Sequence, residues 1–147
     1  MAGEVLTECV FAPRILGGFG ILMNEDIAMT IAARKFVVSE FACPSDGEPI
    51  RSVVLETEES VIVVWHVLPG QELAAHVHSH GQDIWTVLSG SADYYQGNGV
   101  VTKLKAGEIA VAKPGQVHGA LNTDAKDPFV FVSVVAPGNA GFALAEK

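Results

Sequence analysis

The sequence is poor in charged residues and contains no cluster of basic ones. Only 18% of its 147 residues are charged, against the roughly 25% that is usual for soluble domains. Nine lysines and arginines stand against 17 aspartates and glutamates, which gives a net charge of −8, and the longest basic run is Arg34-Lys35. A protein that binds nucleic acid or an anionic membrane surface needs a basic patch. We therefore expect neither partner.

Cysteines and long hydrophobic runs are also scarce. The two cysteines, Cys9 and Cys43, form no CxxC pair, so a zinc or redox motif of that kind is excluded. The longest uncharged run, residues 128–145, is broken by Pro137 and Gly138, which favours a strand and a loop over a membrane span. The first residues lack the basic start of a signal peptide. These features predict a cytoplasmic protein.

Hydrophobic residues, in contrast, are plentiful. They make up 49% of the chain, and the mean hydropathy is +0.33. Such a composition excludes disorder over most of the chain. The length fits one domain with one core. The excess of apolar residues fits a second subunit that covers part of the surface, and it fits a larger core equally well.

The chain divides into an N-terminal extension over residues 1–50 and a β-rich part over residues 51–147. In the extension, Asn24 can cap a short helix over residues 25–36. A polar loop with two prolines, residues 43–49, marks the border. We predict that residues 51–147 form a single domain.

This second part reads as a series of short strands separated by turns. The run Gly97-Asn98-Gly99 is a hairpin signal. Regular spacing without intervening helices is typical of an antiparallel sandwich or barrel. The predicted strands cover residues 60–67, 72–80, 84–88, 92–96, 100–104, 109–112, 118–122 and 129–135.

Histidines gather in one of these strands. Residues two apart in a strand point to the same face, so His76 and His78 are expected to project together, and His80 joins them only if the strand continues. Asp83 follows after a turn, and His118 comes after another glycine turn and can reach the same point if the hairpins stack. Imidazoles and a carboxylate suit Fe(II), Mn(II), Ni(II), Cu(II) or Zn(II). We therefore predict a divalent metal site.

The spacing of these residues resembles the two motifs of the cupin superfamily. The first motif, G-x5-H-x-H-x(3,4)-E-x6-G, is matched by Gly70-x5-His76-x-His78-x4-Asp83-x6-Gly90. The second, G-x5-P-x-G-x2-H-x3-N, is matched by Gly107-x5-Lys113-Pro114-Gly115-x2-His118-x3-Asn122. Asp83 stands where the family has Glu, and Lys113 stands where it has Pro. Gln82 fits the shorter spacing of the first motif, so it is an alternative to Asp83 as the fourth ligand.

The resemblance implies an all-β fold, the cupin double-stranded β-helix or jelly-roll barrel. It also implies a divalent metal inside the barrel, held by His76, His78, Asp83 and His118. Trp85 shares strand parity with Asp83, so it either faces the cavity or packs in the core. Homodimers that exchange N-terminal strands are common among similar proteins, and we expect a homodimer to which residues 1–50 contribute.

The expected function is that of a metal-dependent enzyme acting on a small organic substrate that chelates the metal. The resemblance allows a dioxygenase with Fe(II). With Zn(II), Mn(II) or Ni(II) the metal would act as a Lewis acid, which would make the protein an isomerase, lyase or cyclase. His80 or Tyr94 is then the candidate base. The third hypothesis is a non-catalytic cupin that binds a small molecule.

Overall fold

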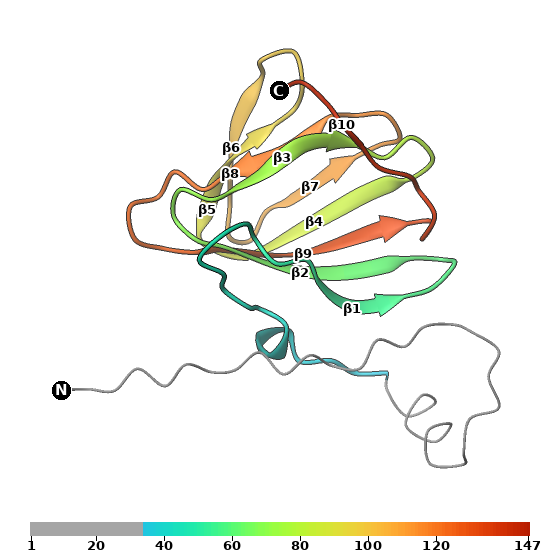
Figure 1. Ribbon diagram of the computed structural model, residues 1–147, viewed down its shortest axis with the longest axis horizontal. Coiled ribbons are helices and arrows are strands. Elements are labelled where there is room, and N and C mark those ends of the chain that lie inside the picture. Colours follow the sequence, from blue (N-terminus) through green and yellow to red (C-terminus); the bar gives the residue numbers. More distant parts are fainter. Residues whose placement is uncertain (1–33) are drawn as a thin grey trace.

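The structure, a computed structural model, describes residues 34–147 as an all-β barrel (Figure 1). Within this range there is no α-helix, and a single turn of 3-10 helix, η1, covers Val38–Glu40. None of the described helices is long and apolar enough to cross a membrane. The strands are β1 Ser52–Glu56, β2 Val61–Val67, β3 Glu72–Val77, β4 Gln82–Ser89, β5 Ser91–Tyr95, β6 Val101–Lys105, β7 Ile109–Ala112, β8 His118–Leu121, β9 Phe129–Ala136 and β10 Ala143–Leu144.

The strands form two five-stranded sheets. One sheet has the order β1-β2-β9-β4-β7 and the other the order β10-β3-β8-β5-β6, with antiparallel pairing between neighbours. Most consecutive strands cross from one sheet to the other, as in β2 to β3 and β3 to β4, whereas β1-β2 and β5-β6 are hairpins within one sheet. This topology is the double-stranded β-helix that the sequence predicts. Every predicted strand is present, and β1 and β10 are strands that the sequence pattern did not predict.

Alternation along the strands decides which side chains enter the barrel. In β4, Asp83, Trp85 and Val87 are buried, whereas the residues between them are half-buried or exposed. In β9, Phe129, Phe131 and Ser133 are buried in the same way. A period of two is what a sheet with one face toward a core requires.

The core fills one end of the barrel with aromatic and aliphatic side chains. Trp85 stacks on Phe131 with ring centroids 4.1 Å apart, and Tyr94 meets Trp85 edge-on at 5.4 Å. These geometries are the favourable ones for aromatic pairs. The cluster comprises Val67, Leu73, Trp85, Val87, Ala92, Tyr94, Leu104, Ala120, Phe129 and Phe131.

Two motif residues outside the metal cluster shape the turns. Gly90, between β4 and β5, has a φ of +73°, and a Cβ there would collide with the carbonyl of Pro128; only glycine fits such a position. Asn122 is fully buried, and its amide donates hydrogen bonds to the carbonyls of Val67 and Asp127, at 2.9 and 3.0 Å. The motif asparagine therefore holds the end of β8 in place.

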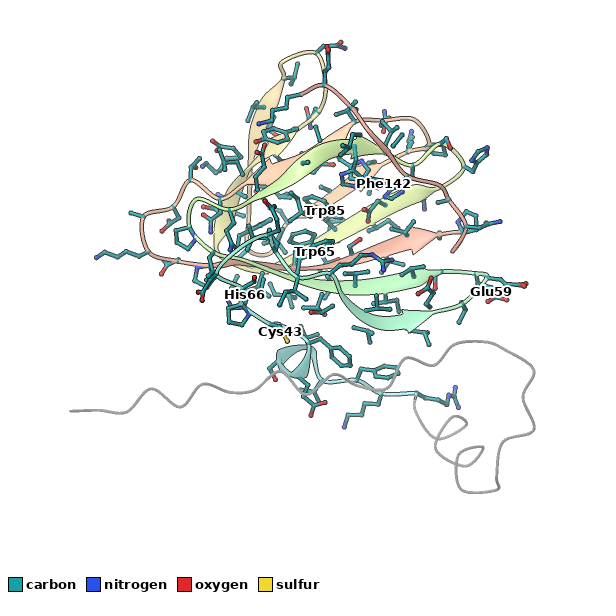
Figure 2. The ribbon with its side chains drawn as sticks, viewed as in Figure 1. Cys43, Glu59, Trp65, His66, Trp85 and Phe142 are labelled. Carbon is teal, nitrogen blue, oxygen red and sulfur yellow. The ribbon has the colours of Figure 1, made fainter. Side chains whose placement is uncertain are left out.

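The N-terminal helix predicted over residues 25–36 lies almost entirely outside the described residues. Its last residues, 34–36, have no helical structure. Downstream, Phe41 and Cys43 are buried, and Figure 2 places Cys43 beside His66, on the outer side of β2. The division of the chain at residue 50 stays a prediction.

Candidate metal centre

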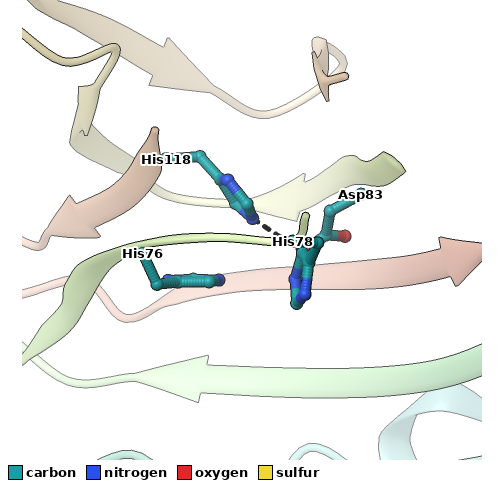
Figure 3. Close-up of side chains that lie close together, drawn as sticks. All are labelled: His76, His78, Asp83 and His118. Atoms are coloured by element: carbon teal, nitrogen blue, oxygen red, sulfur yellow. Dashed lines mark hydrogen bonds and ion pairs between the residues drawn. The ribbon is translucent and has the colours of Figure 1, made fainter. Parts of the chain in front are cut away.

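Four side chains from two sheets converge inside the barrel (Figure 3). His76, His78, Asp83 and His118 each offer one ligand atom, and these atoms all lie within 4.8 Å of one another. His76 in β3 pairs in register with His118 in β8, which places the two imidazoles side by side, with ring centroids 4.1 Å apart. His78 lies one residue beyond β3, and Asp83 comes from β4 in the facing sheet. A shared ion would therefore tie the two sheets together.

Backbone carbonyls fix the tautomer of all three imidazoles. The Nδ1 atoms of His76, His78 and His118 lie 2.8, 2.6 and 3.0 Å from the carbonyl oxygens of Ala74, Gly141 and Gln116. A carbonyl only accepts hydrogen bonds, so each Nδ1 carries the proton of the neutral ring. The lone pair is then left on Nε2, which is the arrangement that metal-ligating histidines commonly have.

The carboxylate of Asp83 faces the same point. Its Oδ1 accepts a hydrogen bond of 2.6 Å from Ser133, while Oδ2 lies 3.2 Å from Nε2 of His118 and 3.5 Å from Nε2 of His78. The buried Nε2 of His78 has no hydrogen-bond partner. The Nε2 lone pairs of the histidines and the carboxylate of Asp83 thus face one another, and there are too few protons among them to form hydrogen bonds. A divalent cation satisfies such a set, so the residues present fit the metal that the motifs imply.

Burial and neighbouring groups shift the pKa values of these side chains in different directions. Burial is the largest effect on His76 and lowers its pKa to about 4, so this imidazole is neutral at physiological pH. The pKa of His78 is raised, mainly by Asp83, so a metal ion would compete with a proton there. Burial alone would raise the pKa of Asp83, but the adjacent imidazoles of His118 and His78 and the hydrogen bond from Ser133 hold that pKa well below its usual range. The aspartate is therefore ionised.

Gln82 and Trp85 point to opposite sides of β4. Trp85 and Asp83 both point into the barrel. Trp85 is 1% exposed, and its ring lines the cavity as well as packing in the core. Gln82 has the outward parity and does not line the cavity. The geometry thus favours Asp83 over Gln82 as the fourth ligand.

The two residues predicted as candidate bases lie away from the cavity. His80 is exposed, beyond the end of β3, and its Nδ1 lies 2.7 Å from the hydroxyl of Ser79. The strand ends at Val77 rather than reaching His80, so strand parity does not bring this imidazole to the metal cluster. Tyr94 is buried in the core, where burial raises its pKa to about 12. Neither side chain lines the cavity beside the metal centre.

A cavity of about 650 Å³ opens beside the metal ligands, and most of its lining is apolar. Figure 2 shows Trp65, Trp85 and Phe142 in this part of the barrel. The exposed ring of Phe142 lies 5.1 Å from that of His76. Sequence reasoning missed Ser133, Phe142 and Arg51 as cavity residues. Only Ser133 carried a signal, because it is the one polar residue at the inward positions of β9.

Known proteins share this fold. Residues 63–135 match the family model described as Cupin domain. A protein from Klebsiella pneumoniae, described as an uncharacterized conserved protein with a double-stranded beta-helix domain, is 72% identical. The match covers 78% of this chain and 99% of that one, with a TM-score of 0.76. The chain therefore belongs to the cupin superfamily.

More distant structures agree on the fold. The protein TT1209 from Thermus thermophilus is 25% identical over 70% of this chain and 96% of its own, with a TM-score of 0.65. An oxalate oxidase is 17% identical over 69% of this chain and 57% of its own, with a TM-score of 0.58, so the fold also occurs in an enzyme. No curated protein matches the chain.

Proposed function

We propose that this cupin is a metal-dependent enzyme of the non-haem Fe(II) dioxygenase type, acting on a small organic substrate that chelates the metal. The observation that carries the proposal is the cluster of three histidines and one aspartate, of which His76, His78 and Asp83 line a largely apolar cavity. These four residues would hold the ion, and the adjoining cavity would give a small substrate access to it.

The chain's own residues have distinct parts in this proposal. His76, His78 and His118 have their Nδ1 atoms on backbone carbonyls and turn Nε2 toward the metal position, and Asp83 supplies one negative charge. Bound Fe(II) would supply the redox chemistry that side chains lack. The apolar wall, with Trp65 and Leu73, excludes water and holds the organic part of the substrate.

Oxidative chemistry is favoured over Lewis-acid chemistry because neither predicted base lies at the cavity. An isomerase or lyase with Zn(II), Mn(II) or Ni(II) needs a side chain that takes a proton from the substrate. His80 and Tyr94 do not line the cavity, and Glu72 is engaged by Tyr95 and Lys147. The exposed Glu48 is the carboxylate at the cavity that a Lewis-acid enzyme could use instead. The Lewis-acid enzyme and a non-catalytic binding protein are the alternatives to this proposal.

The test is metal analysis of natively purified protein, followed by oxygen-uptake measurements with Fe(II)-loaded and Zn(II)-loaded protein. Chelating organic acids serve as trial substrates. We expect about one divalent ion per subunit and oxygen uptake with Fe(II) only. Anaerobic turnover by the Zn(II) form would support the Lewis-acid alternative. Saturable binding without turnover in either form would support the binding protein.

We also propose that the chain forms a homodimer through the outer face of the sheet β1-β2-β9-β4-β7. Aliphatic side chains follow one another across that face, because Val111 pairs with Ile84, Ile84 with Val134, and Val134 with Ile62. Val111 remains 50% exposed. Apolar surface of this kind favours association by about 25 cal/mol for each Å² that is buried.

Light scattering on the full chain, on the Val111→Lys variant and on a chain that begins at Ser45 tests the dimer. We expect a dimer for the full chain and a monomer for Val111→Lys. We expect the shortened chain to dimerise less, since residues 1–50 are proposed to contribute. A monomeric full chain at micromolar concentration would rule out the dimer. A shortened chain that remains dimeric would remove the role of the extension.

A further inference from the structure

Besides the histidines, four charged residues line the cavity, and two of them have partners. Glu72 pairs with Lys147, and Asp83 belongs to the metal centre. Arg51 and Glu48 are different, since no ion pair joins either of them to another residue in the described range 34–147. Both are exposed, and Arg51 is the one lysine or arginine among the residues that line the cavity.

The β-sheet holds Arg51 beside the apolar wall of the cavity. It immediately precedes β1, where Ser52 pairs with Val64 of β2. The antiparallel register therefore places Arg51 beside Trp65, whose side chain also lines the cavity. A cation and a large aromatic surface thus lie next to each other at the same wall.

Charge balance then decides which ligand fits. A divalent ion on three neutral imidazoles and one carboxylate would keep a net positive charge. The charges of Arg51 and Glu48 offset each other, so the cavity with its ion would stay positive. Between them the wall is apolar, with Val61, Val63 and Trp65. A planar guanidinium binds a carboxylate with two parallel hydrogen bonds.

We propose that the cavity selects small organic carboxylates, with the carboxylate on Arg51 and the apolar body against Trp65. This inference rests on the proposed function, because it names the substrate class of the same site. It assigns Arg51 as a specificity-determining residue. The opposite outcome would be a cavity that selects substrates with an ammonium group, which would face Glu48.

Benzoate and the neutral benzamide are a matched pair of probes for this proposal. Their binding to full-length, Zn(II)-loaded protein is measured by ligand-observed NMR. We expect benzoate to bind more tightly than benzamide. Arg51→Gln should weaken benzoate binding about tenfold, the factor expected for one hydrogen bond to a charged group, and leave benzamide unchanged. Glu48→Gln is the control at the same mouth and should not weaken benzoate binding.

Two results would overturn the proposal. One is equal binding of benzoate and benzamide to the wild-type protein. The other is an unchanged preference for benzoate in Arg51→Gln, which would place the carboxylate on the metal instead. Benzylamine binding that is lost in Glu48→Gln, with no preference for benzoate, would establish the opposite outcome. A failure of the oxygen-uptake test leaves these binding results unaffected, so the two proposals fail separately.

Discussion

The two ends of the barrel interior are lined by the same strands but differ in chemistry. Along β4, the inward residues change from Asp83 through Trp85 to Val87. The residues of β9 that pair with them change from Val135 through Ser133 to Phe131. One end therefore carries ligands and a cavity, and the other end carries a close-packed core.

The difference shows how a small barrel accommodates a polar site. A buried polar group costs free energy unless it has a partner, and at the metal end the imidazoles and Asp83 are paired with backbone carbonyls, Ser133 or one another. Trp85 marks the boundary, because its ring contacts both His118, at 5.8 Å, and Phe131, at 4.1 Å. We infer that the two ends can be altered independently.

The largest effect is expected from removing two ligands together. His76→Ala, His78→Ala should abolish the one divalent ion expected per subunit, since both imidazoles are lost from the cluster. The β-rich circular dichroism should remain, because the core end is untouched. Metal analysis of the purified variant checks this. His80→Ala is the control and should keep its metal; full metal content in the double variant would show that the centre is elsewhere.

The second prediction breaks the core end and leaves the metal end intact. Phe129 is 0% exposed, and Phe129→Ala should lower the free energy of unfolding by about 3–5 kcal/mol. Urea unfolding of metal-free protein measures this change. Phe142→Ala removes an exposed ring and should change stability by about 0.5 kcal/mol at most. If folded Phe129→Ala protein no longer bound metal, the two ends would not be independent.

The contrast between the ends also explains what the sequence could predict. Strand positions follow from alternating side chains and turn residues, and the predicted strands agree with the structure to within a few residues. Metal ligands were recognisable because two histidines two residues apart, an aspartate and a distant histidine match a spacing pattern. Asp83 could be preferred over Gln82 only provisionally, and the parity of β4 now places Asp83 inward.

Features that depend on packing between distant segments could not be predicted. β10 has only two residues, and it is a strand because it pairs with His76 and Val77 of β3. The sequence places His80 with His76 and His78 only if the strand continues, and β3 ends at Val77. Arg51 lines the cavity because β1 packs beside β2, which no local pattern indicates.

The third prediction ranks three side chains by how much their loss should weaken metal binding. Asp83→Ala removes a ligand and should weaken metal binding most. Ser133→Ala removes the hydrogen bond that orients Asp83 and should weaken binding about 10–100-fold. Gln82→Ala, on the outward side of β4, should have little effect. Titration against a competing chelator gives the order, and a larger loss in Gln82→Ala than in Asp83→Ala would move the fourth ligand to Gln82.

The smallest effect is expected where the C-terminal segment closes over the metal end. Glu72 at the start of β3 pairs with Lys147 and accepts a hydrogen bond of 2.6 Å from Tyr95. Both partners lower the pKa of Glu72, and Lys147 has the larger effect. A carboxyl group with a lowered pKa stabilises the fold above its unfolded pKa of about 4.3. That stabilisation is lost as the pH falls through the lower, folded value.

Glu72→Gln should therefore lower the Tm at pH 7 by a few degrees at most, because the pair is largely exposed to solvent and screened. The difference from wild type should shrink steadily below pH 4.5 or so, as the wild-type carboxyl is protonated too. Thermal unfolding from pH 3 to pH 8 measures it. Asp93→Asn removes the ion pair of 2.6 Å with Lys103, which holds β5 to β6 away from the C-terminal segment. If both variants lowered the Tm equally but only Glu72→Gln weakened metal binding, the C-terminal segment would be part of the metal end. If the Tm difference between Glu72→Gln and wild type grew toward acid pH, the pairing of Glu72 with Lys147 would be contradicted.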